Sequence, residues 1–176
     1  GDFFGRSLAA GDFNRDGRDD LAIGAPGEDV FSIVNAGAVN VVYGSRTGLT
    51  AAGNQFWHQN TSGVLNSSEA HDQFGQSLAV GDFNGDQYDD LAIGVPGEDL
   101  VRGNGRFSVA VQDAGAVNVL HGRWYGVTAS GDQFWNQDTV GVYEQAESHR
   151  VNRCTGSICT TSPGLRTPGD RFGTSL

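Results

Sequence analysis

The chain contains one nine-residue acidic segment twice, and this recurrence constrains its fold more than any other feature. The segment DFNRDGRDD occupies residues 12–20, and DFNGDQYDD occupies residues 82–90. Each copy lies between the same flanks, FGxSLAxG before it and LAIGxPGED after it. Self-similarity of this kind is typical of proteins built from structural repeats. We therefore expect a repeat protein in which every repeat carries the same loop.

Each acidic loop places oxygen-bearing side chains at positions 1, 3, 5 and 9, and position 7 would contribute only its backbone carbonyl. A tight turn brings alternate residues round to one centre, and Ca2+ requires several oxygen ligands at once. The predicted ligands are Asp12, Asn14, Asp16, Arg18 and Asp20 in the first loop, and Asp82, Asn84, Asp86, Tyr88 and Asp90 in the second. We expect one calcium ion in each loop, and a metal-free turn rich in aspartate is the alternative.

The loops differ from an EF-hand, and they differ from each other at one position that bears on turn geometry. An EF-hand needs flanking helices and a bidentate glutamate at position 12, where this chain has Ile23 or Ile93 in a predicted strand. At position 6 the first loop has Gly17, which eases a sharp turn, whereas the second loop has Gln87. We therefore expect the second site to be the weaker one.

Composition narrows the function classes. The net charge is -10, and the 11 basic residues are all arginine and scattered, so a nucleic-acid partner is not expected. Eight of the 21 acidic residues lie in the two loops, and two bound divalent ions would change the charge from -10 to -6. No stretch is long and apolar enough for a membrane-spanning helix. The acidity is therefore attributed mainly to cation binding.

The 27 glycines and the short apolar runs predict an all-β chain of short strands joined by tight turns. LAIG and LAVG are apolar on both faces, which indicates buried inner strands. The aromatic pairs in QFWHQ and QFWNQ suit an outer strand, with rings that pack between sheets. The expected strands are 6–11, 20–24, 38–43 and 55–60 in the first repeat, and 76–81, 90–94, 116–121 and 133–138 in the second.

The FG dipeptide sets the domain boundaries. It occurs at residues 4–5, 74–75 and 172–173, so the successive steps measure 70 and 98 residues. The extra length of the second step indicates loop insertions. The expected units are a first repeat at 1–73, a second at 74–171 with insertions at about 100–113 and 142–170, and the start of a third at 172–176.

The run FGxSLAxGDFNxDGxxDLAIGxPGE, followed by GAVNVxYG, closely resembles the FG-GAP repeat. This repeat is the blade unit of the propeller in integrin alpha chains and in many secreted bacterial proteins. The resemblance covers nearly the whole chain apart from the insertions. It implies four-stranded antiparallel blades around a central axis, with the cation loop between the first two strands. Because such rings need about four to eight blades, the chain is expected to be an excerpt of a longer array or to associate with other copies.

Cys154 and Cys159 lie within the second insertion, close enough in sequence for a local disulfide. Such a bond would indicate an oxidising, extracellular compartment. Free thiols or a zinc site are the alternatives, although His149 alone does not complete a four-ligand set. Asn60 and Asn66 each begin an N-x-S/T triplet and would accept glycans if the source glycosylates.

No catalytic motif such as GxSxG or HExxH is present, and the aspartates are spaced for a cation rather than as an acid and a base. We expect a non-enzymatic, calcium-binding extracellular β-propeller module that acts as an adhesion or structural scaffold. Its loops would bind a protein or glycan partner at the cell surface or matrix. Its ends would contact further FG-GAP repeats in cis or neighbouring copies in trans. The alternatives are an accessory propeller of a secreted hydrolase, such as a phospholipase-type enzyme, and the repeat unit of a homopolymeric surface fibre.

Overall fold

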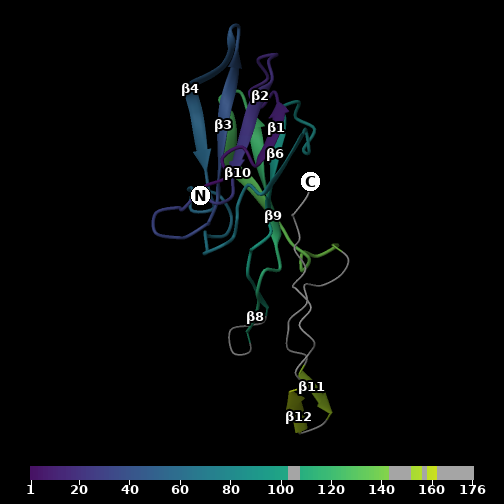
Figure 1. Ribbon diagram of the computed structural model, residues 1–176. Helices are drawn as coiled ribbons and strands as arrows, with labels where there is room; N and C mark the ends of the chain where they lie inside the picture. The colour runs from purple at the N-terminus through teal and green to yellow at the C-terminus, as the bar shows by residue number, and fades with distance from the viewer. Residues whose placement is uncertain (103–107, 143–151, 156–157, 162–176) are drawn as a thin grey trace.

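The computed structural model describes residues 1–102, 108–142, 152–155 and 158–161, the last two ranges as backbone only. Within these residues every regular element is a β-strand, which confirms the all-β prediction. Two four-stranded antiparallel sheets lie against each other (Figure 1), and strand β1 (Ser7–Gly11) of one contacts strand β5 (Ser77–Gly81) of the other. None of the described elements is a helix that could span a membrane.

The first repeat folds into one sheet whose strands pair in chain order. Its strands are β1 (Ser7–Gly11), β2 (Asp20–Ala25), β3 (Ala38–Ser45) and β4 (Gly48–Trp57). The pairing of β1 with β2 ends at Gly11 opposite Asp20. The acidic loop is therefore the connection of a β-hairpin, and its two ends are held by the sheet.

The second repeat folds in the same way, with its strands in the spatial order β5, β6, β9 and β10. These strands are β5 (Ser77–Gly81), β6 (Asp90–Val95), β9 (Ala116–Arg123) and β10 (Gly126–Trp135). The first pair ends at Gly81 opposite Asp90, so both acidic loops start from the same register. A separate two-stranded sheet, β7 (Leu100–Arg102) with β8 (Val109–Val111), occupies the expected first insertion.

The outer strands correct the predicted boundaries. They were expected at 55–60 and 133–138, but they begin earlier, at Gly48 and Gly126, and end at Trp57 and Trp135. Both start after a two-residue turn that the sequence pattern did not reveal, with φ of 113° at Gly48 and 111° at Gly126. A break in register within each outer strand also interrupts the alternation of apolar and polar residues on which the prediction depended.

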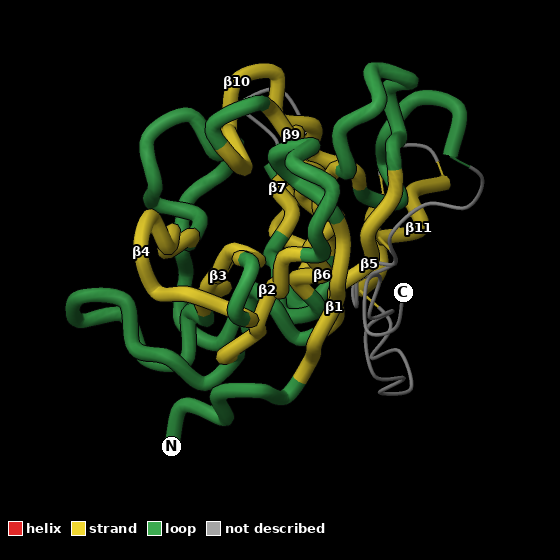
Figure 2. The backbone as a smooth tube through the Cα atoms, turned by 90° about the horizontal axis from the view of Figure 1, so that it is seen from above, coloured by secondary structure: helices red, strands yellow, loops and turns green. Residues whose placement is uncertain are grey.

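The main hydrophobic core lies between the two sheets rather than within one of them. From the first sheet it takes Phe13, which is fully buried, together with side chains of β3 such as Val41. From the second it takes Leu91 and Leu120, which are also fully buried. Figure 2 shows the two sheets from above, with β1 and β5 adjacent. Burial of these faces against each other is the principal stabilising contribution to the arrangement of the two repeats.

The FG dipeptide of the second repeat lies between the two sheets and contacts both of them. The N–H of Phe74 donates to the carbonyl of Ala36 at 2.9 Å, the N–H of Gly75 donates to the carbonyl of Gly94 at 3.1 Å, and the Phe74 side chain is fully buried in the core. Gly37, at φ 84°, lies directly against Phe74, and a Cβ on Gly37 would come within 2.4 Å of the Phe74 backbone. Only glycine fits this contact. The first sheet is therefore covered in part by a residue that the sequence assigns to the second repeat.

In the second insertion, β11 (Asn152–Thr155) and β12 (Ile158–Thr161) form an antiparallel hairpin in which Cys154 is the register partner of Cys159. The disulfide between these cysteines stays a prediction, and this register is compatible with it. The rest of the insertion from 143 onward and the predicted start of a third repeat at 172–176 lie outside the described residues.

Candidate cation loops

The first acidic loop is closed by hydrogen bonds from its own backbone. Asp12 accepts from the N–H of Asp16 at 2.9 Å and from the N–H of Gly17 at 2.8 Å. Asn14 Oδ1 accepts from the Asp16 N–H at 3.0 Å, and Asp16 Oδ1 accepts from the Arg18 N–H at 3.0 Å. These bonds gather the predicted ligands of positions 1, 3 and 5 around one short turn.

The second loop repeats these four bonds and adds one from the N–H of Gly85 to Asp82 Oδ1 at 2.7 Å. Asp82 accepts from the N–H of Asp86 at 3.0 Å and of Gln87 at 2.9 Å. Asn84 Oδ1 accepts from the Asp86 N–H at 2.9 Å, and Asp86 Oδ1 accepts from the Tyr88 N–H at 3.1 Å. The same residue types at the same spacing therefore give the same loop conformation in both repeats.

Both loops need a left-handed backbone at two positions, not at one. Position 6 has φ of 80° at Gly17 and 72° at Gln87, as the turn argument anticipates. Position 4 is also left-handed, with φ of 59° at Arg15 and 78° at Gly85. Each loop thus has one glycine and one strained residue with a side chain. The lower affinity expected of the second loop stays a prediction, but turn strain alone does not supply its reason.

The aspartate at position 9 is buried beneath each loop and joins it to the sheet. Asp20 is 1% exposed, and its carboxylate accepts from the N–H groups of Phe13 at 3.1 Å and Gly44 at 2.8 Å. Burial, with a smaller contribution from nearby Asp12 and Asp16, raises the pKa of Asp20 to about 6 against the lowering effect of those two N–H donors. Asp20 is therefore a buried acid in a locally negative site.

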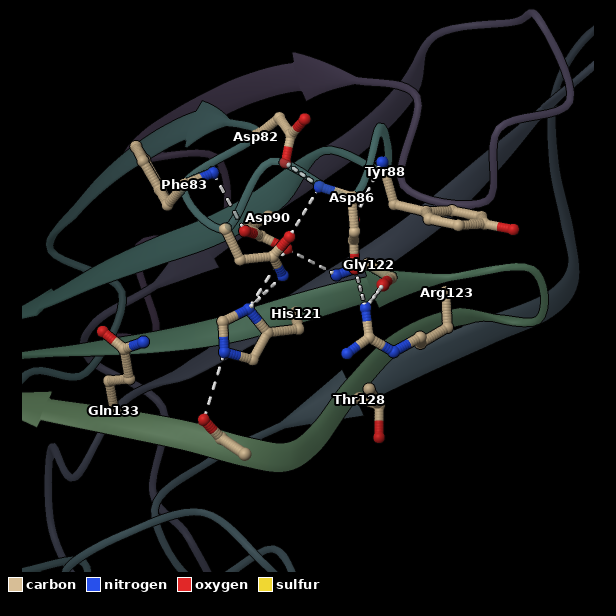
Figure 3. Close-up of polar contacts among 12 residues, drawn as sticks. Asp82, Phe83, Asp86, Tyr88, Asp90, His121, Gly122, Arg123, Thr128 and Gln133 are labelled. Carbon is tan, nitrogen blue, oxygen red and sulfur yellow. Dashed lines mark hydrogen bonds and ion pairs between the residues drawn. The ribbon is translucent and has the colours of Figure 1, made fainter.

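Asp90 occupies the same position in the second loop and is 0% exposed. Its carboxylate accepts from the N–H groups of Phe83 and Gly122, both at 3.0 Å. Figure 3 shows these bonds below the loop. Both position-9 aspartates therefore bridge the first turn of the loop to the third strand of the sheet.

The donor set fits a hard divalent cation in its chemistry, because the side chains offer carboxylate and amide oxygens only. Burial is the main cause of the raised pKa of Asp20, and repulsion by Asp12 and Asp16 adds to it; a bound cation would relieve that repulsion. The oxygens are not gathered into a finished cage, however. Among the described residues no group of three or more histidine, cysteine or acidic side chains is arranged to hold a metal ion. Binding would require Asp12 and Asp16 to turn oxygens from backbone N–H groups to the ion.

The two loops also contact each other across the boundary between the sheets. The N–H of Asp12 donates to Asp89 Oδ2 at 2.8 Å, and the N–H of Asp89 donates to the carbonyl of Asp12 at 3.3 Å. Asp19 has the position of Asp89 in the first loop, and it is exposed. The contact therefore has a direction: an aspartate at position 8 caps the loop of the preceding repeat.

Comparison with protein families gives the decisive match. The FG-GAP repeat model matches residues 4–42 and 74–120, which are the two runs that contain the acidic loops and the three strands around them. This chain belongs to the FG-GAP repeat family. The two four-stranded antiparallel sheets are accordingly two propeller blades, as the sequence predicted.

The FG-GAP chain is similar to two groups of curated proteins. It is 38% identical over 89 residues to the phosphatidylinositol-glycan-specific phospholipase D of Rattus norvegicus, which covers 51% of this chain and 10% of that protein. It is 35% identical over 126 residues to integrin alpha-X of Mus musculus, covering 69% of this chain and 9% of that protein. Integrin alpha-PS5 of Drosophila melanogaster is 41% identical over 100 residues, covering 56% and 9%. The chain thus spans about a tenth of the length of these relatives.

The second FG-GAP blade brings two further side chains to its loop that the sequence analysis did not select. His121 Nδ1 lies 3.2 Å from Asp90 Oδ1 and 3.2 Å from the amide nitrogen of Asn84. Arg123 Nη1 donates to Asp86 Oδ2. Both residues lie at the end of β9, beneath the loop (Figure 3). Aligning LHGR with VYGS of the first repeat would have revealed that this strand carries basic residues in one blade only.

The FG-GAP motif PGED also contributes a buried acid that was not predicted. Glu98 is fully buried, and its carboxylate accepts from Gln59 Nε2 at 2.6 Å and from the side-chain nitrogen of Asn66. Burial raises the pKa of Glu98 to about 8, and the charge of Asp72 adds to the effect. Asp72 is itself fully buried, and burial raises its pKa to about 6. Gln59 and Asn66 belong to the segment between the blades, so Glu98 binds that segment to the second blade.

Proposed function

We propose that this chain is a calcium-binding FG-GAP module of an extracellular β-propeller that serves as an adhesion or structural scaffold and does not catalyse a reaction. The observation that carries the proposal is the pair of identical loops. Asp12 and Asp82 each accept from the N–H groups at positions 5 and 6 of their loop. Two loops with one donor set and one conformation support a shared ligand rather than two unrelated turns.

Calcium is favoured over other ions by the ligand chemistry. The side-chain donors are carboxylates and amides, with Arg18 and Tyr88 able to add backbone carbonyls. Soft transition metals favour thiolate and imidazole ligands, and Mg2+ demands a stricter octahedral geometry than a flexible loop offers. The net charge of -10 would also be reduced by two bound ions.

The exposed end faces support further FG-GAP repeats in cis, or neighbouring copies in trans, as partners. Phe13 is fully buried between the blades, whereas Phe83 at the same repeat position is 56% exposed. At the opposite end, Leu78 is buried and its counterpart Leu8 is 59% exposed. Each end therefore exposes a surface whose counterpart in the other blade is buried where the two blades meet. One more blade at each end would bury both faces.

A polar contact between the blades supports the same arrangement. Gln59 follows β4 and donates to Glu98 of the second blade. Gln137 has the corresponding position after β10, and among the described residues its Oε1 atom, like that of Gln59, is buried without a hydrogen-bond partner. A glutamate from a third repeat would accept from Gln137 Nε2 as Glu98 accepts from Gln59 Nε2. We therefore assign Gln137 to a contact with the blade that follows.

The adhesion role rests on the integrin relatives, and the loop insertions are the surfaces we assign to a protein or glycan partner. The hairpin of β7 and β8 extends from the second blade in Figure 1, away from the cation loops. A rigid sheet that displays such an insertion is a common binding scaffold. The phospholipase D relatives favour a second candidate, an accessory propeller of a secreted hydrolase. A homopolymeric surface fibre of stacked blades is a third arrangement compatible with the exposed end faces.

Calorimetric titration with Ca2+ and with Mg2+ tests the proposed cation function. The intact chain is expected to bind two calcium ions, and Asp12→Ala and Asp82→Ala should each remove one site. Asp113→Asn, which changes an exposed carboxylate outside both loops, is the matched control and should retain both sites. Absence of calcium binding, together with equal melting temperatures in chelator and in excess Ca2+, would show that the loops are metal-free turns.

A further inference from the structure

The two FG-GAP loops differ in what their third strand places beneath them. Ser45 pairs with Gly48 at the end of β3, and Arg123 pairs with Gly126 at the end of β9. Ser45 and Arg123 are therefore the same structural position in the two blades. The first blade has a hydroxyl there, and the second has a guanidinium. The repeat itself thus supplies an internal comparison.

Arg123 is fixed between its own strand and the second loop. Its Nη1 atom donates to Asp86 Oδ2 and also to the carbonyl of Gly122, the latter at 2.9 Å. The Asp86 carboxylate retains its other oxygen for the N–H of Tyr88 at 3.1 Å. The predicted calcium ligand at position 5 is therefore already bound on one side by a side chain from another strand, as Figure 3 shows.

The equivalent ligand in the first loop lacks such a partner from the sheet. Among the described residues Asp16 pairs with Arg18 of its own loop, at 3.2 Å. Solvent screens this pair about as much as the pair of Arg123 with Asp86, since the side chains are 40% and 36% exposed in the first and 36% and 32% exposed in the second. The difference is that Arg123 is held by its own strand, whereas Arg18 belongs to the loop itself. Ser45 directs its hydroxyl to the carbonyl of Gly48 at 2.5 Å, away from Asp16. The strand beneath the first loop therefore brings no positive charge to it.

The buried aspartates show the same contrast. His121 lies against Asp90 in the second blade, with Nδ1 3.2 Å from the carboxylate, and its Nε2 atom is 3.1 Å from the carbonyl of Gly131. In the first blade Tyr43 replaces His121 and donates instead to Gln55 at 2.6 Å. Within the described part of the chain, Asp20 is paired with no basic side chain. The second loop thus has basic groups from β9 beside two of its predicted ligands, and the first has none from β3.

We propose that Arg123 is a tethered counter-ion of the second FG-GAP loop: its guanidinium takes part of the place of a bound calcium ion, so that the second blade keeps its loop folded without Ca2+ and the first blade does not. This inference rests on the proposed calcium function. A guanidinium on Asp86 competes with an ion for that carboxylate and repels the ion, which lowers calcium affinity at the second loop. In the absence of Ca2+ the same guanidinium offsets the repulsion among the loop carboxylates. Calcium binding then determines whether the loop of the first blade is folded, whereas the loop of the second blade is folded with or without calcium.

A reciprocal exchange tests the counter-ion. Arg123→Ser gives the second blade the residue of the first, and Ser45→Arg makes the opposite change. Each is measured by calcium titration with the other loop silenced, by Asp12→Ala for the second loop and by Asp82→Ala for the first. Removing an exposed to half-buried ion pair is expected to raise calcium affinity of the second loop by roughly two- to fivefold. Ser45→Arg should lower that of the first loop to a similar extent.

Hydrogen exchange in chelator supplies a readout that does not depend on metal binding. In the unmodified chain, amides of residues 82–90 should be better protected than those of 12–20, and Arg123→Ser should remove that difference. Arg123→Gln retains a hydrogen-bond donor without the charge and serves if Arg123→Ser folds poorly. Arg102→Ser breaks a comparable pair, Arg102 with Asp138, which lies apart from both loops, and should leave both measurements unchanged.

The outcomes separate this inference from the proposed function. One outcome is that the first loop binds calcium but Arg123→Ser changes neither the calcium affinity of the second loop nor the protection of its amides from exchange. In that case the counter-ion role of Arg123 is overturned and the cation function stands. If neither loop binds calcium in any variant, the cation function fails. In that case a loss of protection at 82–90 in Arg123→Ser would still support Arg123 as the stabilising charge of its loop, and unchanged protection would overturn it.

Discussion

The guanidinium of Arg15 donates a hydrogen bond to the side-chain oxygen of Gln87, with 2.5 Å between Nη2 and Oε1. Within the two acidic loops these are the two residues that hold a left-handed backbone without being glycine, at φ 59° and 72°. They come from different positions of different loops and meet across the boundary between the blades. Arg15 also lies over the ring of Tyr88, with 5.9 Å from its guanidinium carbon to the ring centroid. The strained residue of each loop thus contacts the neighbouring loop, beside the contact of Asp12 with Asp89.

Replacing either strained residue by glycine should stabilise the chain. Arg15→Gly and Gln87→Gly each relieve a backbone cost of about 1 kcal/mol, and each forfeits the same exposed hydrogen bond. Because that bond can be lost only once, the double variant should gain more than the sum of the single gains. Urea unfolding of the four proteins in a double-mutant cycle measures this coupling. Simple additivity would mean that Arg15 and Gln87 do not interact in solution.

Removing the buried aspartate should harm the first blade more than the second. Asp20→Ala leaves two N–H groups without acceptors, one of them on fully buried Phe13, at a cost of about 2–4 kcal/mol. Asp90→Ala also frees two N–H groups, that of buried Gly122 and that of Phe83, but Phe83 is 56% exposed, so that water can replace the bond of Phe83. Thermal unfolding in chelator isolates this effect from metal binding. Equal losses in the two variants would contradict the ranking.

Truncation of Phe13, which is buried between the blades, should destabilise the chain far more than truncation of Phe83, which is exposed at the same repeat position. Phe13→Ala empties a fully buried site and should cost about 3–5 kcal/mol, whereas Phe83→Ala should cost less than about 1 kcal/mol in the isolated chain. Denaturant unfolding tests both. If copies associate through the end faces, sedimentation should show that Phe83→Ala weakens the association, and a large loss of stability of the monomer on that change would contradict the assigned exposure.

Stability should fall as pH rises from about 5 to about 8. The pKa of Glu98 is raised by burial to about 8, and that of Asp72 to about 6, so the folded chain keeps protons that the unfolded chain releases near pH 4 to 5. Stabilisation from these protons is complete below the unfolded pKa and is lost as pH rises through the folded one. Melting temperatures in chelator should therefore decline over this range.

Glu98→Gln is the variant that tests the source of this slope, because it keeps a side chain of the same shape that cannot ionise. The decline between pH 6 and 8 should become shallower in Glu98→Gln. Glu28→Gln, at the same position of the first repeat, where the side chain is half-buried, should leave the slope as it is. An unchanged slope in Glu98→Gln would assign the pH dependence to other groups.

Much of the fold was predictable because the same sequence pattern occurs in both repeats. The loops, the inner strands and the order of the four strands all follow from local patterns that recur, and the φ of Gln87 agrees with the glycine at the same position. What could not be predicted depends on contacts between distant segments. Arg123 contacts Asp86 of the loop from strand β9, and Glu98 is bound by Gln59, which belongs to the segment between the blades. The left-handed φ of Arg15 was missed because no glycine marks it in its own repeat.

The contact of Phe74 with the first sheet means that the unit of duplication and the unit of folding are out of phase along the chain. A segment cut at the FG dipeptides would contain the first sheet without the phenylalanine that packs against it in the core between the sheets. Residues 1–73 alone would therefore expose a face that Phe74 covers in the intact chain. The boundary of the sequence repeat is thus not the boundary of a stable unit.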